Sequence, residues 1–207
     1  MQRKIRVLVA DDHYIVRMGL VALLETEADF EIVGEAEDGA AAVRTTLDIR
    51  PDVVLMDLMM PILDGVEATR QIHAQAPDVK ILILTTSTVS DDLVHALDAG
   101  AIGATTKSAD NIALLSAIRS VAAGIQTISP EIRQMISDDP PVPDLTKRQV
   151  EILHSITRGL TNQEIAKQFG ISPESVKDHI NAIYAKLGAA TRAEAVAIAL
   201  RKHLLKN

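Results

Sequence analysis

Short apolar runs and stretches of helical periodicity alternate along the first 124 residues. The apolar runs are rich in β-branched residues and predict five strands, at residues 5–10, 30–33, 53–56, 80–84 and 101–106. Strands with near-continuous apolar sequence are typical of a parallel sheet that helices cover on both faces.

The segments between and after these runs predict helices. Residues 13–26 form a broad apolar helix, and Leu114, Ile118 and Val121 recur at spacing i, i+4, i+7. Five strands alternating with five helices predict a doubly wound α/β domain. In such folds ligands bind beyond the carboxyl ends of the strands.

The periodicity changes after residue 144. The pattern there predicts four helices, at residues 147–158, 162–169, 173–187 and 192–202. Ser172 and Pro173 suit the start of the third helix, and Gly188 suits its end. A short helix, a turn with glycine and a longer helix make up a helix-turn-helix unit.

The third of these helices has two distinct faces. An apolar stripe at spacing i, i+4, i+7, i+11 consists of Val176, Ile180, Ile183 and Leu187. The opposite face is polar and carries Lys177, Asp178 and Asn181. Such a helix is able to enter the major groove of DNA. A solvated amphipathic helix in a protein-binding bundle is the alternative that the pattern alone leaves open.

A proline-rich segment separates the two patterns. Residues 137–144 contain three prolines and no periodicity of either kind, which favours a semi-rigid linker. We therefore predict a first domain at 1–124, a linker at 125–143 and a second domain at 144–207. A surface loop inside one domain is the alternative.

Charge divides at the same place. Residues 1–143 contain 11 Lys and Arg against 22 Asp and Glu, and residues 144–207 contain 10 against 6, so net charges of −11 and +4 make up the total of −7. A basic segment beside an acidic one indicates that the basic one binds a polyanion.

Composition excludes several classes of site. The chain has no cysteine, so disulfides, thiolate zinc sites and thiol nucleophiles are excluded. Aromatic residues make up only 2%, which argues against a base-stacking platform for single strands. No apolar run approaches the roughly 20 residues of a membrane span, and the first one ends too early for a signal peptide. We expect a cytoplasmic protein.

Polar residues with chemical potential follow the predicted strands. Asp11 and Asp12 follow the first strand, Asp57 the third, Thr85 the fourth and Lys107 the fifth. Clustered carboxylates repel one another, and their oxygens suit Mg²⁺, which is commonly shared with phosphate oxygens. Each residue taken alone is also typical of a turn or helix cap.

These residues, in this order, resemble the receiver domains of bacterial two-component response regulators. The similarity covers residues 4–124, and the motifs are Val9-Ala10-Asp11-Asp12-His13, Leu55-Met56-Asp57 with Pro61 and Gly65, Leu84-Thr85, Ala99-Gly100-Ala101 and Lys107. The resemblance implies a flavodoxin-like fold with a five-stranded parallel sheet.

The same resemblance implies a role for each polar residue. Asp57 is expected to accept a phosphoryl group, with Thr85 and Lys107 as its partners. Asp11, Asp12 and Asp57 are expected to hold Mg²⁺ together with the backbone carbonyl of Met59. Met59 and Ser87 are expected to flank the phosphoacceptor.

One position departs from the receiver pattern. Receivers usually have Tyr or Phe three residues before the lysine, and this aromatic swings inward when the threonine moves. Here the position is Ala104. Either activation proceeds without the aromatic, or the receiver is controlled by a protein partner without phosphorylation.

The second domain resembles the LuxR-type (NarL/FixJ) DNA-binding domain over residues 144–205. The matching motifs include Leu145-Thr146, Gly159-Leu160-Thr161-Asn162-Gln163-Glu164-Ile165-Ala166, Val176-Lys177-Asp178-His179 and Lys186-Leu187-Gly188. The resemblance implies base contacts from Lys177, Asp178 and Asn181. Phosphate contacts are expected from Ser172, Ser175, Lys167 and Lys186. The resemblance also implies dimerisation through Ala193, Val196, Ala197 and Leu200.

Together these features predict a cytoplasmic DNA-binding response regulator. A histidine kinase or a small phosphodonor would phosphorylate Asp57, and this would control domain release, homodimerisation on two-fold symmetric double-stranded DNA and transcription. Beyond Mg²⁺-dependent self-phosphorylation and autodephosphorylation no enzyme activity is expected, and no membrane partner. An aspartyl-nucleophile phosphatase is the alternative, but such enzymes have the nucleophile after the first strand.

Overall fold

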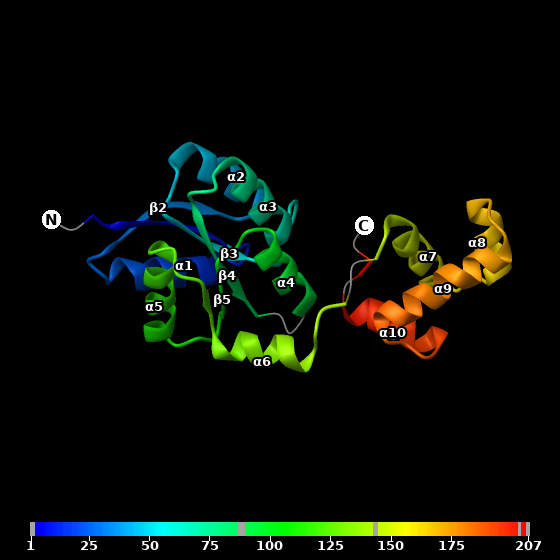
Figure 1. The fold of residues 1–207 in the computed structure, drawn as a ribbon. Coiled ribbons are helices and arrows are strands. Elements are labelled where there is room, and N and C mark those ends of the chain that lie inside the picture. The colour runs from blue at the N-terminus through cyan, green and yellow to red at the C-terminus, as the bar shows by residue number, and fades with distance from the viewer. Residues whose placement is uncertain (1–2, 87–89, 143–144, 203, 206–207) are drawn as a thin grey trace. The chain divides into compact units, whose positions relative to one another are not determined.

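The computed structural model describes residues 3–86, 90–142, 145–202 and 204–205. The chain divides into two compact units, Met1–Pro140 and Pro141–Asn207. Figure 1 shows the elements of each unit.

The first unit contains one parallel sheet. Its strands are β1 (Ile5–Ala10), β2 (Phe30–Ala36), β3 (Val53–Asp57), β4 (Lys80–Thr85), β5 (Gly103–Thr106) and β6 (Thr127–Ile128). Their order is β2-β1-β3-β4-β5-β6, and every pairing is parallel. The predicted doubly wound α/β fold is confirmed, and the five predicted strands all form.

Helices cover both faces of this sheet. One face packs against α1 (Tyr14–Glu25) and α5 (Asn111–Ala122), and the other against α2 (Gly39–Ile49), α3 (Gly65–Gln75) and α4 (Ser90–Asp98). Side chains of alternate residues on a strand point to opposite faces. Val7 and Val9 accordingly lie in one buried cluster, and Leu8 lies in the other.

The predicted linker at 125–143 is wrong over much of its length. Residues 127–128 form β6 beside β5, so the sheet has six strands rather than five. Pro130–Asp138 form α6, whose Ile132 is fully buried in the core of the first unit. The prolines that suggested a linker follow this helix, and Pro130 occupies its first turn, where the missing N–H costs nothing.

The second unit consists of α7 (Lys147–Thr157), α8 (Asn162–Phe169), α9 (Pro173–Leu187) and α10 (Arg192–Arg201). The four predicted helices are confirmed within one residue at each end. Capping boxes begin α7 and α8, and Gly170 and Gly188 end α8 and α9 with positive φ angles of 64° and 66°. Within the described residues, no helix combines the length and apolar character that crossing a membrane requires.

Candidate functional site

The carboxyl ends of the strands β1, β3 and β5 bring an ammonium group between two carboxylates. Lys107 Nζ lies 2.6 Å from Asp11 Oδ2 and 2.9 Å from Asp57 Oδ2. The three side chains are at most 9% exposed. An ion pair this deeply buried is stable only when each charge is compensated, and here one cation serves two anions.

A close approach of the chain fixes the position of Asp57. Gly65, at the start of α3, lies so near β3 that an added Cβ would stand 2.1 Å from the Asp57 carbonyl oxygen. The Gly65 N–H donates to the Leu58 carbonyl at 2.9 Å, and Asp64 caps α3 by accepting from the Glu67 N–H. A side chain at Gly65 would push this loop away from the site.

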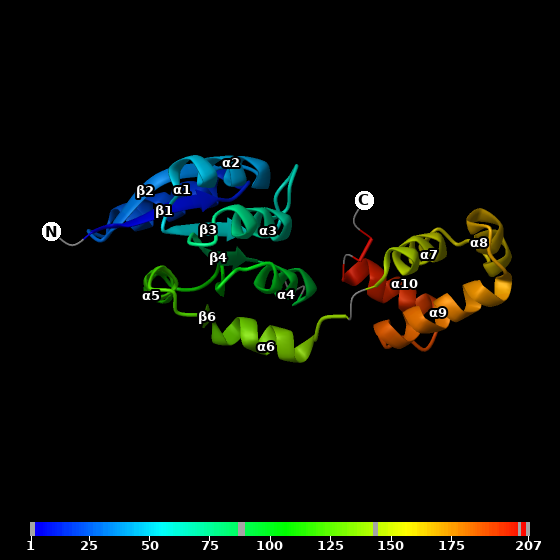
Figure 2. The same ribbon diagram turned by 45° about the horizontal axis from the view of Figure 1, so that its top comes forward.

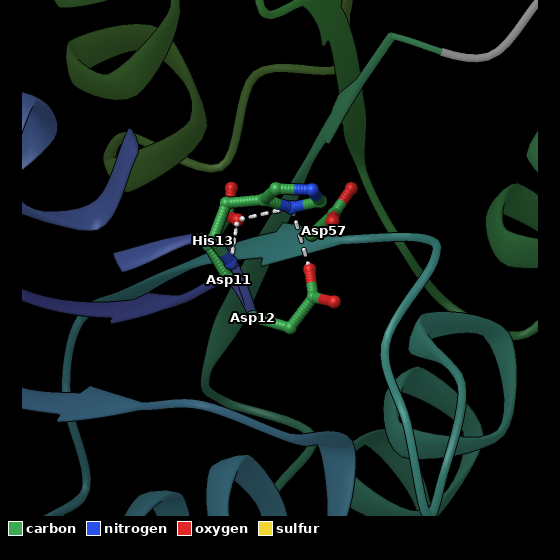
Figure 3. A group of neighbouring side chains, drawn as sticks. All are labelled: Asp11, Asp12, His13 and Asp57. Carbon is green, nitrogen blue, oxygen red and sulfur yellow. Dashed lines mark hydrogen bonds and ion pairs between the residues drawn. The ribbon is translucent and has the colours of Figure 1, made fainter. Parts of the chain in front are cut away.

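His13 and Arg17 hold the acidic pair that follows β1. The His13 N–H donates to Asp11 Oδ1 at 2.9 Å, and its ring Nδ1 lies 2.8 Å from Asp12 Oδ1. Arg17 Nη1 donates to the Asp11 carbonyl at 2.7 Å. Figure 3 shows Asp11, Asp12, His13 and Asp57 gathered at the strand ends. The sequence alone predicts no role for His13 or Arg17, although His13 directly follows the acidic pair.

Burial and charge alter the ionisation of this group. Burial raises the pKa of Asp57 above its usual range, although hydrogen bonds from Lys107 and the Met59 backbone N–H favour the charged form. Burial alone would lower the pKa of Lys107, but hydrogen bonds to Asp11 and Asp57 outweigh burial and raise it. Lys107 therefore remains a cation at neutral pH.

The arrangement fits a divalent metal ion. Asp11, Asp12, His13 and Asp57 each offer one ligand atom, and these atoms all lie within 4.8 Å of one another. Asp11 and Asp57 are buried beside the Lys107 ammonium, and Asp12 lies nearby. The three negative charges of these carboxylates exceed the one positive charge of Lys107. Carboxylate oxygens are the ligands that Mg²⁺ prefers, so the donor set suits this ion.

The remaining predicted residues of this site lie nearby. Thr85 ends β4 and is 1% exposed, and its carbonyl accepts from the Lys107 N–H at 2.9 Å. Met59 contributes its N–H to Asp57, while its side chain is half exposed. Its carbonyl as a metal ligand stays a prediction, and Ser87 lies outside the described residues.

The helix α9 presents the two faces that its sequence predicts. Val176, Ile180, Ile183 and Leu187 are buried in the core of the second unit. Lys177, Asp178 and Asn181 are exposed on the opposite side. This exposed polar face carries the three residues that we expect to contact bases.

The residues expected to contact phosphates differ in their present contacts. Lys167 is exposed. Ser172 caps α9 and accepts from the Ser175 N–H at 3.1 Å. Lys186 donates to Gln149 Oε1 at 3.0 Å, and Gln149 is 7% exposed. The Lys186 ammonium thus ties α9 to the start of α7, a contact that sequence periodicity does not reveal.

The helix α10 carries the apolar stripe that we expect to dimerise. Ala193, Ala197 and Leu200 are exposed, Leu200 by 60%, and Val196 is half-buried. The opposite side contributes Ala195 and Ala199 to the core. Val196 also packs against that core, whereas Ala193, Ala197 and Leu200 are apolar surface beyond what folding of the unit uses.

Comparison with known proteins identifies both units. Residues 7–119 match the response regulator receiver domain, and residues 143–199 match the luxR family of bacterial regulatory proteins. The chain belongs to the LuxR-type response regulators. It is thus a DNA-binding response regulator of a two-component system, with a receiver domain (Met1–Pro140) and a DNA-binding domain (Pro141–Asn207).

Relatives that match nearly the whole length of this LuxR-type regulator support the assignment. It is 40% identical to the transcriptional regulatory protein LiaR of Bacillus subtilis over 97% of this chain and 99% of LiaR. It is 36% identical to the response regulator protein VraR of Staphylococcus aureus over 98% of this chain and 99% of VraR. The crystal structure of ChrA, a response regulator of a heme-sensing two-component system, matches with a TM-score of 0.60 and 36% identity over 98% of this chain and 100% of ChrA.

Proposed function

We propose that phosphorylation of Asp57 controls DNA binding by this regulator. A sensor histidine kinase, or a small phosphodonor such as acetyl phosphate, supplies the phosphoryl group. The observation that carries this proposal is the Lys107 ammonium held 2.9 Å from Asp57 Oδ2 and 2.6 Å from Asp11 Oδ2. A cation placed there neutralises charge on a phosphoryl group attached to Asp57.

The chemistry divides among the residues of the site. An Asp57 carboxylate oxygen attacks phosphorus and the donor departs, which forms an acyl phosphate. Lys107 and the Thr85 hydroxyl then bind oxygens of the new phosphoryl group. Mg²⁺, held by Asp11, Asp12, Asp57 and the Met59 carbonyl, supplies neutralising charge when bound. This self-phosphorylation and its hydrolysis are the only reactions proposed for the chain.

DNA binding is proposed to require two copies of the chain. The exposed face of α9 enters the major groove, where Lys177 suits guanine and Asn181 suits adenine. The stripe on α10 pairs with the same stripe of a second copy, which makes a two-fold symmetric contact. The expected DNA site therefore has two half-sites related by two-fold symmetry.

Opposite charges of the two domains favour an inactive state in which they attract each other. The receiver segment has a net charge of −11 and the DNA-binding segment +4. We propose that phosphorylation releases this attraction, and that the protein acts in the cytoplasm where bacterial DNA lies. Small-angle scattering curves that are the same with and without phosphorylation would count against release.

A DNA-binding assay tests the proposal. A duplex is first selected from random sequences with the full chain, and fluorescence anisotropy then measures its affinity with and without Mg²⁺ and acetyl phosphate. We expect affinity to rise for the unaltered chain and to stay constant for Asp57→Ala. Equal, phosphodonor-independent affinity of both proteins would instead favour control by a protein partner, the alternative that Ala104 supports.

A further inference from the structure

The helix α6 is anchored in the core of the receiver domain. Its Ile132 is fully buried, and it lies in the same apolar cluster as Leu93 and Ala96 of α4 and Ala104 of β5. Figure 2 shows α6 alongside α4, and the two helices are in contact. Removing α6 would therefore expose part of the apolar core.

The strand β6 holds the start of α6 against β5. Ala104 pairs with Ile128, and the Ser129 N–H donates to the Ala104 carbonyl at 3.0 Å. Ser129 then caps α6, because its Oγ accepts from the Ile132 N–H at 3.4 Å. Two hydrogen bonds, both through Ser129, thus connect the backbone of Ala104 with that of Ile132, the buried anchor of α6.

Ala104 also connects this contact with the phosphoacceptor site. It pairs with Ile83 on β4, and Thr85 is two residues further along the same strand. Side chains two residues apart on a strand share a face, so Thr85 lies on the face that α6 helps to cover. Ala104 belongs to the same buried cluster as Ile83 and Ile132, and a close-packed interior transmits a shift of one side chain to its neighbours.

We propose that α6 detaches from β5 when Asp57 is phosphorylated and passes the change to the DNA-binding domain. The inference rests on the proposed function, because it requires a phosphoryl group on Asp57. As the Thr85 hydroxyl turns toward that group, the packing around Ala104 loosens. Ile132 then leaves the buried cluster that it shares with Ala104. Only residues 139–146 separate α6 from α7, so detachment lengthens the tether between the domains.

Hydrogen exchange of the full chain, followed by mass spectrometry, tests the inference. With Mg²⁺ and acetyl phosphate we expect amides of residues 127–138 to exchange about tenfold faster, because local opening becomes easier. Asp57→Ala should show no acceleration. Intact mass measured on the same sample separates two failures: no added phosphoryl group contradicts the proposed function and this inference with it, whereas a phosphorylated chain with unchanged exchange in residues 127–138 overturns the inference alone.

A conservative pair of variants gives a second test. Ile132→Val shortens the buried anchor, and exposed Ser137→Ala on the same helix is its control. We expect Ile132→Val to raise DNA affinity of the unphosphorylated chain about threefold, in keeping with the small cost of Ile→Val changes in cores. Affinities equal to those of Ser137→Ala, with both proteins folded by circular dichroism, would contradict the role of α6.

Discussion

Lys107 compensates two carboxylates at once, which makes it the most sensitive residue of the acidic site. Its ammonium contacts Asp11 and Asp57, and all three side chains are largely buried. Removing one member of a buried ion pair leaves an uncompensated charge. In this site two anions lose the same cation.

Lys107→Met should therefore destabilise the receiver domain by about 3 kcal/mol. Urea unfolding with a chelator measures the loss, and exposed Lys4→Met is the control. Saturating Mg²⁺ should restore part of the stability, because a ligand that binds only the folded state stabilises it. A Lys107→Met domain as stable as the control would contradict the compensating role.

Asp57→Asn should have the opposite effect on stability in metal-free protein. Burial raises the pKa of Asp57 above its ordinary value of 3.8. The favourable contribution of Asp57 to the free energy of unfolding is thus fully present below pH 3.8, and it is lost as pH rises through the folded-state pKa. Above the folded-state pKa the ionised carboxylate opposes folding, so Asn should there raise Tm in a chelator, and Mg²⁺ should narrow the difference in Tm. A lower Tm for Asp57→Asn at such a pH would show that Lys107 outweighs burial.

Among the elements, the helix α9 keeps the residues that pack in the core apart from those that we expect to contact DNA. Its buried stripe packs in the core, while Lys177 and Asn181 are exposed. Substitutions on the exposed face are therefore expected to alter DNA binding without unfolding the domain. Lys186 is the exception, since its ammonium is hydrogen-bonded to buried Gln149.

Lys177→Ala should weaken binding to the selected duplex by about 1–3 kcal/mol and relax sequence preference at one base pair. Lys167→Ala on α8 is the matched comparison, because a phosphate contact weakens binding to all sequences alike. Anisotropy titrations with the selected duplex and single-base variants distinguish the two patterns. If Lys177→Ala lowers affinity equally for every duplex, Lys177 contacts phosphate rather than a base.

The apolar stripe on α10 makes a separate prediction. Leu200→Glu places a charge at a position that is 60% exposed, so the isolated fold should tolerate it. Against a second copy, the same charge would be buried without a partner, which is costly. We expect Leu200→Glu to bind DNA as a monomer by analytical ultracentrifugation, and exposed Ala190→Glu to behave like the unaltered chain. Unchanged dimers of Leu200→Glu on DNA would rule out this stripe as the interface.

The elements that were predicted correctly have local signals in the sequence, and the two missed ones, β6 and α6, had weaker signals. Asp57 and Lys107 follow apolar runs directly, so topology alone predicted that they approach each other. The helix α6 was missed because Pro140, Pro141 and Pro143 dominated the interpretation of its neighbourhood. Ile132, Met135 and Ile136 recur there at spacing i, i+3, i+4 and pack on the core, and this is the signal that could have revealed the helix.

The contacts of His13 and Arg17 lay beyond sequence reasoning for another reason. The His13 ring reaches Asp12, and Arg17 reaches the carbonyl of Asp11, which is six residues earlier in the chain. Periodicity predicts which face of a helix is buried, but it carries no information on which acceptor a long polar side chain selects. Such contacts depend on the positions of both partners in three dimensions.

In the whole molecule, the state of a single carboxylate, that of Asp57, is proposed to control DNA binding by the other domain. A ligand or modification shifts an equilibrium only by its different interaction energies with the two states. In the proposed active state the phosphoryl group would interact with Lys107 and Thr85, and the apolar stripe of α10 would meet a second copy. We therefore expect phosphorylation and dimerisation to strengthen each other.

Native mass spectrometry of the full chain after incubation with Mg²⁺ and acetyl phosphate tests this coupling most directly, since one spectrum reports phosphoryl load and oligomeric state. Asp57→Ala is measured beside it, with a short duplex containing the selected site present in both samples. We expect phosphorylated dimers for the unaltered chain and unphosphorylated monomers for Asp57→Ala. Dimers in equal proportion for both proteins, or phosphoryl groups retained by Asp57→Ala, would contradict this expectation.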